Sequence, residues 1–159
     1  MSKYTPKLYA ERVKKSISEM GHHLTYVSVK ESPSFAYSTG ITSSYGMPEI
    51  FISSLPPGLS GDFISSYISR FAKASLSINN LIQSDDGDAP FDYYLIRVED
   101  GKLDEYVLAS IKYYEQAPFE YLQLVFPDTN LKFPHQSGYD YDQEIIGDYS
   151  VIEQDASAL

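Results

Sequence analysis

The chain has 159 residues, of which 43% are hydrophobic and 21% charged, a composition typical of one globular domain rather than a disordered chain. It contains no cysteine, which excludes disulfide bonds, thiolate zinc sites and cysteine nucleophiles. The formal net charge is −10: residues 1–80 carry eight basic and five acidic side chains, whereas residues 81–159 carry four and 17. Because acidic surfaces repel phosphate backbones, this balance disfavours nucleic-acid binding and favours a basic partner, unless the acidic residues serve only solubility.

The first half of the chain predicts a helix, three strands and a second helix. Apolar residues spaced about four apart follow Pro6, and Gly21 is suited to end this helix. Three short runs rich in β-branched and aromatic residues, typical of strands, come next at 23–29, 34–41 and 49–55. After two prolines, apolar residues recur every four positions, which predicts a helix over about 59–74.

The second half predicts two more strands around an ambiguous segment. The runs "FDYYLIRV" and "FEYLQLVF" have strand composition, and Pro127 stops the second of them. Residues 103–115 allow either a hairpin strand or a helix. We favour the helix, because the apolar spacing is nearer the roughly 3.6-residue period of a helix than the two-residue period of a strand. We expect residues 151–159, which lack periodicity, to form a mobile tail.

The order and length of these elements predict an overall architecture. Short links between the early strands favour hairpins over parallel crossovers. We therefore predict a single α+β domain over residues 1–150, with a mostly antiparallel sheet and helices packed on one face. No apolar run approaches the ~18 residues of a membrane span, and the N-terminus lacks a signal-peptide core, so we expect a cytoplasmic protein without membrane contact.

Two stretches of the chain carry a family resemblance. The run "FAYSTGITSSYGMPEI" contains F-A-Y-S-x-G-I followed by G-x-P-E, and the later run "QLVFPDTNLKFPHQSGYD" contains Q-L-V-F-P-D, F-P and G-Y-D. In order and spacing these signatures resemble those of a bacterial family catalogued as domain of unknown function 4262. The resemblance covers about residues 19–140. This resemblance implies membership of that family and leaves the function of the chain open.

The loop between Gly40 and Gly46 has two interpretations. Its glycines and hydroxyl side chains could expose N–H groups that cradle an anion, but we favour a simple connection between strands. Glu49 opens the next strand beside apolar residues, and a carboxylate buried there needs hydrogen-bond partners. We predict that N–H groups of the same loop supply them, which is an architectural role. A general base is the alternative.

The positions of the three histidines in the sequence do not favour a metal site. His22 and His23 are adjacent, and neighbouring residues of a strand point to opposite faces, so they do not readily share a metal ion. His135 could meet His23 and Asp140 in a cleft and form a proton-transfer set. We favour an ordinary surface histidine near a turn.

Tyrosine and acid together suggest a protein-binding surface. Nine of the 15 tyrosines follow residue 81, interleaved with Asp and Glu. Tyr is enriched at interfaces, and an acidic rim steers basic partners. We therefore hypothesise a non-catalytic acidic protein-binding domain without a cofactor, such as an immunity or inhibitor protein that neutralises a basic toxin, for example a nuclease. The predicted partner-binding residues are Asp85, Asp86, Asp88, Asp92, Tyr139, Asp140, Tyr141 and Asp142.

An alternative hypothesis is a small-ligand-binding or enzymatic domain. Its site would be a cleft between the "GITSSYG" loop and the "PDTNLKFPHQSGYD" segment, holding a phosphorylated ligand or a flavin-like cofactor. The predicted lining residues are Tyr37, Gly40, Thr42, Glu49 and His135. The first hypothesis requires an exposed acidic patch, whereas this one requires polar groups that converge in a pocket.

Overall fold

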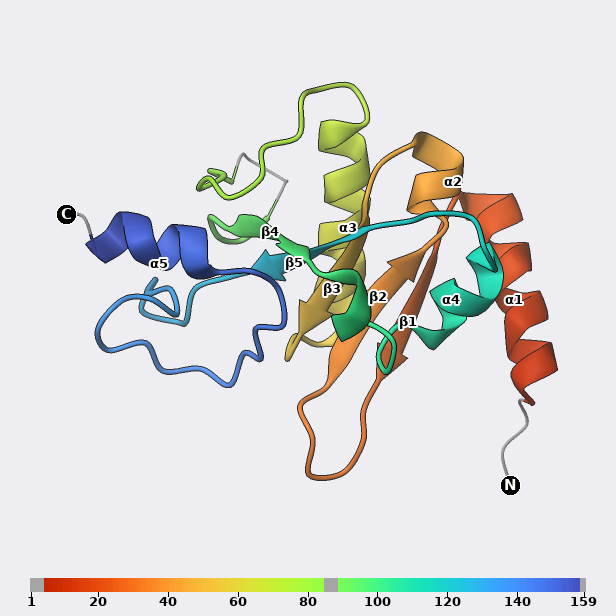
Figure 1. The fold of residues 1–159 in the computed structure, drawn as a ribbon, viewed down its shortest axis with the longest axis horizontal. Coiled ribbons are helices and arrows are strands. Elements are labelled where there is room, and N and C mark those ends of the chain that lie inside the picture. Colours follow the sequence, from red (N-terminus) through yellow and green to blue (C-terminus); the bar gives the residue numbers. More distant parts are fainter. Residues whose placement is uncertain (1–4, 85–88, 158–159) are drawn as a thin grey trace.

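The fold is built around a five-stranded mixed sheet (Figure 1). The computed structural model describes residues 5–84 and 89–157. The strands are β1 (His23–Val27), β2 (Phe35–Thr39), β3 (Glu49–Ser53), β4 (Tyr94–Val98) and β5 (Tyr121–Val125). Their order across the sheet is β1-β2-β3-β5-β4, and all neighbours are antiparallel except β3 and β5, which are parallel. The predicted α+β class and the pairing of β2 with β3 are confirmed.

Five α-helices accompany the sheet in the described part of the chain, and local sequence signals mark both ends of the first of them. They are α1 (Pro6–Met20), α2 (Ile41–Tyr45), α3 (Pro57–Phe71), α4 (Leu108–Tyr114) and α5 (Ser150–Ser157). At the start of α1 the side chain of Thr5 accepts a hydrogen bond from the N–H of Leu8, and Gly21 ends the helix with φ of 90°. None of the helices in the described part of the chain is long and apolar enough to cross a membrane.

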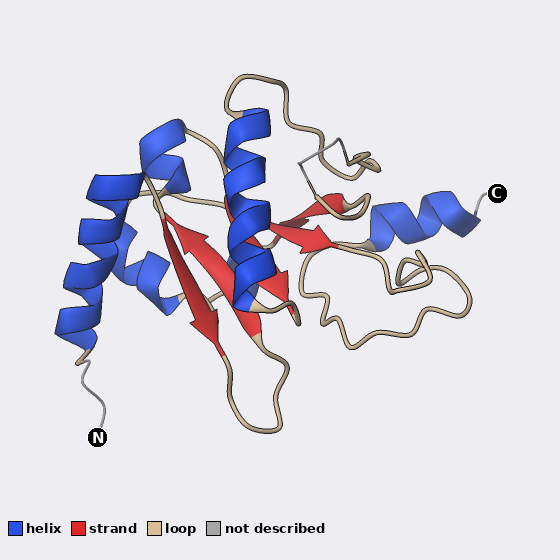
Figure 2. Ribbon diagram, turned by 180° about the vertical axis from the view of Figure 1, so that it is seen from behind, coloured by secondary structure: helices blue, strands red, loops and turns tan. Residues whose placement is uncertain are grey.

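Helix α3 covers one face of the sheet and forms the larger core with it (Figure 2). Alternate residues of the central strands point to this face, among them Ile50 of β3 and Leu122 of β5, both with no exposed surface. Phe63 and Tyr67 of α3 lie parallel, with ring centroids 6.5 Å apart, and pack on them. Their four-residue spacing is the pattern that predicted this helix.

The opposite face is covered by α4, α5 and the loops beside them. Phe51 and Tyr121 of the sheet pack with Leu103 and Val107, while Ile96 and Val125 pack with residues near α5. Helices therefore lie on both faces, and the predicted one-sided arrangement was wrong. All residues of β3 and β5 are buried, so these strands lack the regular polar–apolar alternation that would have marked one face as exposed.

Two segments differ in detail from their predictions. The ambiguous segment 103–115 contains a helix, as favoured, but only over Leu108–Tyr114. We expected a mobile tail from residue 151, but Ser150–Ser157 form α5, and Tyr149 and Ile152 near its start are buried beside Phe133. Because α5 has only eight residues, a few apolar side chains are enough to pack it against the domain. So few residues do not form a recognisable helical period in the sequence.

Candidate functional site

The carboxylate of Glu49 is the centre of a buried polar cluster. Glu49 is the first residue of β3, has no exposed surface and lies on the α4 face of the sheet. Its Oε2 accepts hydrogen bonds from the N–H groups of Gly40 (2.9 Å) and Thr42 (3.2 Å), and its Oε1 accepts from the N–H of Ile41 (3.2 Å) and the hydroxyl of Ser38 (2.7 Å). The prediction that loop N–H groups satisfy this carboxylate is confirmed.

Backbone conformation explains why the loop can present three N–H groups to one side chain. Gly40 has φ of 104°, a left-handed value that favours glycine, and α2 begins directly after it. The first N–H groups of a helix have no partner within the helix, so they are free to donate to Glu49. Gly40 also lies against α1, because a Cβ built on it would approach Cγ1 of Ile17 to 2.7 Å.

Tyr114 closes the cluster from α4. Its hydroxyl donates to Oε2 of Glu49 and accepts a hydrogen bond from the N–H of Ser43 (3.3 Å). Burial and the negative charge of Glu49 raise the pKa of Tyr114 to about 12, so its hydroxyl is a neutral donor at physiological pH. With five donors around it, Glu49 holds the loop, β3 and α4 together and is not free to act as a base.

A second set of hydroxyl groups continues this cluster between β2, β5 and α4. The hydroxyl of Ser110 lies 2.6 Å from those of both Thr39 and Tyr121, and Tyr121 donates to the carbonyl of Ser38 (2.6 Å). Burial raises the pKa of Tyr121 well above its usual value. Sequence reasoning missed these residues, because serine and threonine are common and only the fold brings these four together.

Tyr37 belongs to a neighbouring polar group near α1. Its hydroxyl accepts the N–H of Ala109 at the start of α4 (3.0 Å). Beside it, the hydroxyl of Tyr9 lies 3.0 Å from Nε2 of His23 and 2.9 Å from Oγ1 of Thr25. Burial lowers the pKa of His23, and the nearby positive charge of Arg12 adds to this. This group fixes α1 and α4 against the first two strands.

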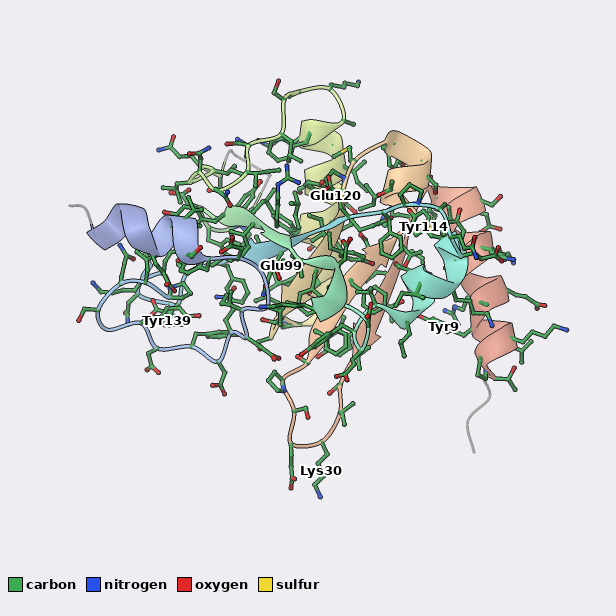
Figure 3. The ribbon with its side chains drawn as sticks, viewed as in Figure 1. Tyr9, Lys30, Glu99, Tyr114, Glu120 and Tyr139 are labelled. Atoms are coloured by element: carbon green, nitrogen blue, oxygen red, sulfur yellow. The ribbon has the colours of Figure 1, made fainter. Side chains whose placement is uncertain are left out.

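His135 lies far from these residues, at the other end of the sheet. The loop from Gly40 to Gly46 precedes β3, whereas His135 follows β5, and the two strands run parallel. The labelled residues Tyr114 and Tyr139 accordingly lie on opposite sides of the molecule in Figure 3. His135 instead packs on Phe133 and hydrogen-bonds through Nδ1 to the hydroxyl of Tyr149. The predicted cleft between the two segments is therefore not formed.

Asp128 shapes the loop that follows β5. Its side chain is 4% exposed and accepts three backbone N–H groups at 2.9 Å, from Asn130, Lys132 and Asp140. These hydrogen bonds, led by that of Lys132, lower the pKa of Asp128. The loop thus has a fixed course as far as Asp140, which belongs to the acidic segment of residues 139–142.

The acidic segment is tied to the end of the sheet at further points. The hydroxyl of Tyr141 donates to the carbonyl of Ser54 (2.6 Å), and the hydroxyl of Ser54 donates to the carbonyl of Asp142 (2.5 Å). The Tyr141 ring packs edge-on against Phe126, with centroids 5.5 Å apart. Nearby, the amide of Gln143 pairs with the N–H and carbonyl of Phe126.

Phe126 also connects the acidic segment to residues near Asp92. Phe91 stacks on Phe126 with centroids 5.7 Å apart, so Asp92 lies at the same end of the sheet as Tyr141. The carboxylate of Asp92 accepts the N–H of Ser84 (2.9 Å). The other predicted partner-binding residues, Asp85, Asp86 and Asp88, lie outside the described residues.

Comparison with known proteins identifies a family but no individual relative. A family model described as "Domain of unknown function (DUF4262)" matches residues 16–140, from the last part of α1 to the acidic segment. No curated protein matches the chain, and no solved structure does.

Proposed function

The chain belongs to the family "Domain of unknown function (DUF4262)", and from the surfaces of this member we propose that it is a non-catalytic, acidic protein-binding domain. Its proposed partner is a basic protein, such as a toxin with nuclease activity. The domain would neutralise this toxin in the cytoplasm as an immunity or inhibitor protein.

One observation carries this proposal: the acidic segment has a fixed backbone and exposed side chains. Asp140 and Asp142 are exposed, and the Tyr141 side chain is 40% exposed, although hydrogen bonds to Asp128 and Ser54 fix the backbone at both ends. A segment that is already ordered loses little conformational freedom on binding. Exposed tyrosine beside acid is a combination suited to a basic protein surface.

The charges of this segment are uncompensated. Within residues 5–84 and 89–157, neither Asp140 nor Asp142 forms an ion pair, in a protein of net charge −10. Uncompensated surface charge produces a field that accelerates encounter with an oppositely charged partner. The non-catalytic part of the proposal is supported by Glu49, whose carboxylate is occupied by structural hydrogen bonds.

The proposal is tested by association kinetics with a basic partner purified from the native host by affinity capture. The double variant Asp140→Lys, Asp142→Lys should associate more slowly and with a weaker dependence on salt, because steering acts on encounter and is screened beyond a Debye length of about 8 Å. The matched control is Asp104→Lys, Glu105→Lys, which makes the same charge change at exposed positions before α4. Equal slowing by both double variants, or by neither, would contradict the proposal.

Tyr141 gives a second readout of the same surface. Tyr141→Ala should act mainly on dissociation, because it removes short-range contact area, and a hot-spot residue contributes about 2 kcal/mol or more. Tyr141→Phe removes only the hydrogen bond to Ser54 and separates loss of the ring from loss of that bond. Urea unfolding of both variants checks that the domain remains folded.

A further inference from the structure

A cavity of about 240 Å³ lies between α1 and α4, away from the acidic segment. Figure 1 shows these two helices side by side, near the edge of the sheet that is formed by β1. Buried and half-buried residues form its walls: Tyr9, Ala10, Val13, Tyr37, Ala109 and Tyr113. Its lining also includes exposed residues of both helices, among them Lys14 and Lys112, which places its mouth at the surface.

The walls of this cavity are preformed. Tyr9 is held by hydrogen bonds to His23 and Thr25, and Tyr37 by the N–H of Ala109. Because these hydroxyls already have partners, the walls offer ring faces and methyl groups to a ligand. An apolar cavity of roughly 150 Å³ holds one benzene molecule, so this volume accommodates one or two fused aromatic rings.

The mouth of the cavity favours a negative charge. Lys14 of α1 and Lys112 of α4 both line it, and neither forms an ion pair among the described residues. Glu115 is the one acidic residue of the lining, so the mouth is positive in a protein of net charge −10. The sequence of α1 carries four basic and two acidic side chains, which adds to this local excess.

From these walls and this mouth we propose that the cavity is a binding site for a small aromatic carboxylate. The ring lies between Tyr9, Tyr37 and Tyr113, where aromatic and aliphatic side chains exclude water. The carboxylate stays at the mouth, where the ammonium groups of Lys14 and Lys112 attract it and water still solvates it. This arrangement avoids burying a charge without a partner.

The probes for this site are 2-naphthoate and its uncharged amide, 2-naphthamide, in calorimetric titrations. The wild-type protein should bind naphthoate more tightly than naphthamide. The double variant Lys14→Gln, Lys112→Gln should lose about fivefold in naphthoate affinity and none in naphthamide affinity, as expected for two solvated charge contacts. Lys15→Gln is the control, because it removes an exposed charge from α1 outside the cavity lining.

A second variant tests the cavity by its volume. Ala10→Leu places a larger side chain into the cavity and should weaken both probes at least tenfold. Backbone amide shifts on adding naphthoate should concentrate at the facing parts of α1 and α4. The proposal is overturned if naphthoate does not bind, if naphthamide binds equally well to the wild type, or if the shifts fall elsewhere. If Ala10→Leu fails to fold, the lysine variants and the amide shifts of the wild-type protein still test the proposal.

Discussion

Tyr114 of α4 donates its hydroxyl hydrogen to the carboxylate of Glu49, which lies 65 residues earlier at the first position of β3. Both side chains are buried, so this contact joins a short helix to the centre of the sheet without help from solvent. The same carboxylate holds the loop after β2 through three N–H groups. One side chain thus fixes three elements that are distant in the chain.

Tyr114→Phe should lower the free energy of unfolding by about 1–3 kcal/mol, because it removes one donor from a buried carboxylate and leaves the ring in place. Urea unfolding measures this change. Tyr113→Phe is the matched control, since among the described residues the Tyr113 hydroxyl hydrogen-bonds only to the exposed Ser43 hydroxyl, at 3.3 Å. It should change stability by less than about 0.5 kcal/mol. Equal effects of the two variants would show that the Glu49 contact does not stabilise the fold.

Gly40→Ala should destabilise the protein more than Gly46→Ala. Both glycines have positive φ, 104° and 70°, and a left-handed alanine costs about 1–2 kcal/mol at either position. At Gly40 the new methyl group would also meet Ile17 at 2.7 Å, whereas at Gly46 nothing lies within 4 Å. Thermal unfolding of the two variants compares the positions directly. A larger effect at Gly46 would mean that α1 does not pack on the loop as described.

Gln123→Leu should release the segment that leads to α5. Gln123 is fully buried; its Nε2 donates to the carbonyl of Glu144 (2.7 Å), and its Oε1 accepts the N–H groups of Ile146 and Gly147 (both 2.9 Å). Leucine has similar volume but leaves these buried backbone groups unpaired, at about 1–3 kcal/mol each. Hydrogen exchange should therefore accelerate over residues 144–152. The exposed Gln116→Leu is the control, and unchanged exchange in Gln123→Leu would contradict the prediction.

Stability should fall in alkaline solution above about pH 10. Burial raises the pKa of Tyr67, Tyr121 and Tyr149, and burial together with Glu49 raises that of Tyr114 to about 12. A tyrosine of the unfolded chain loses its proton near pH 10, before the same residue in the folded protein does. The unfolded state therefore binds fewer protons in this range, and its stability relative to the folded state increases with pH.

Urea unfolding at several pH values, with phenolate absorbance recorded in parallel, measures this alkaline loss. The contribution of Tyr114 should be complete below about pH 10 and lost by about pH 12, so Tyr114→Phe should show a shallower decline than the wild type. A decline of equal slope in both proteins would show that Tyr114 takes no part in it.

Local signals in the sequence determined most of the elements of this fold. The cap at Thr5, the left-handed Gly21 and the four-residue spacing from Phe63 to Phe71 each act within a few turns of one helix, so they are readable without the rest of the chain. The partners of Glu49 were predictable for the same reason. Its N–H donors lie seven to nine residues before it, across one connection between neighbouring strands.

Only the tertiary structure decided which ends of the strands meet. The alternative hypothesis placed His135 and Glu49 in one cleft, but the parallel pairing of β3 with β5 puts the segments that carry them at opposite ends of the sheet. Likewise Tyr114, Ser110 and Tyr121 reach Glu49, Thr39 and Ser38 through contacts across many tens of residues. The cavity beside α1 also depends on α4, which lies far from α1 in the chain. Such contacts depend on how buried faces pack against one another, and because hydrophobic burial is not directional, no short stretch of sequence specifies which faces will meet.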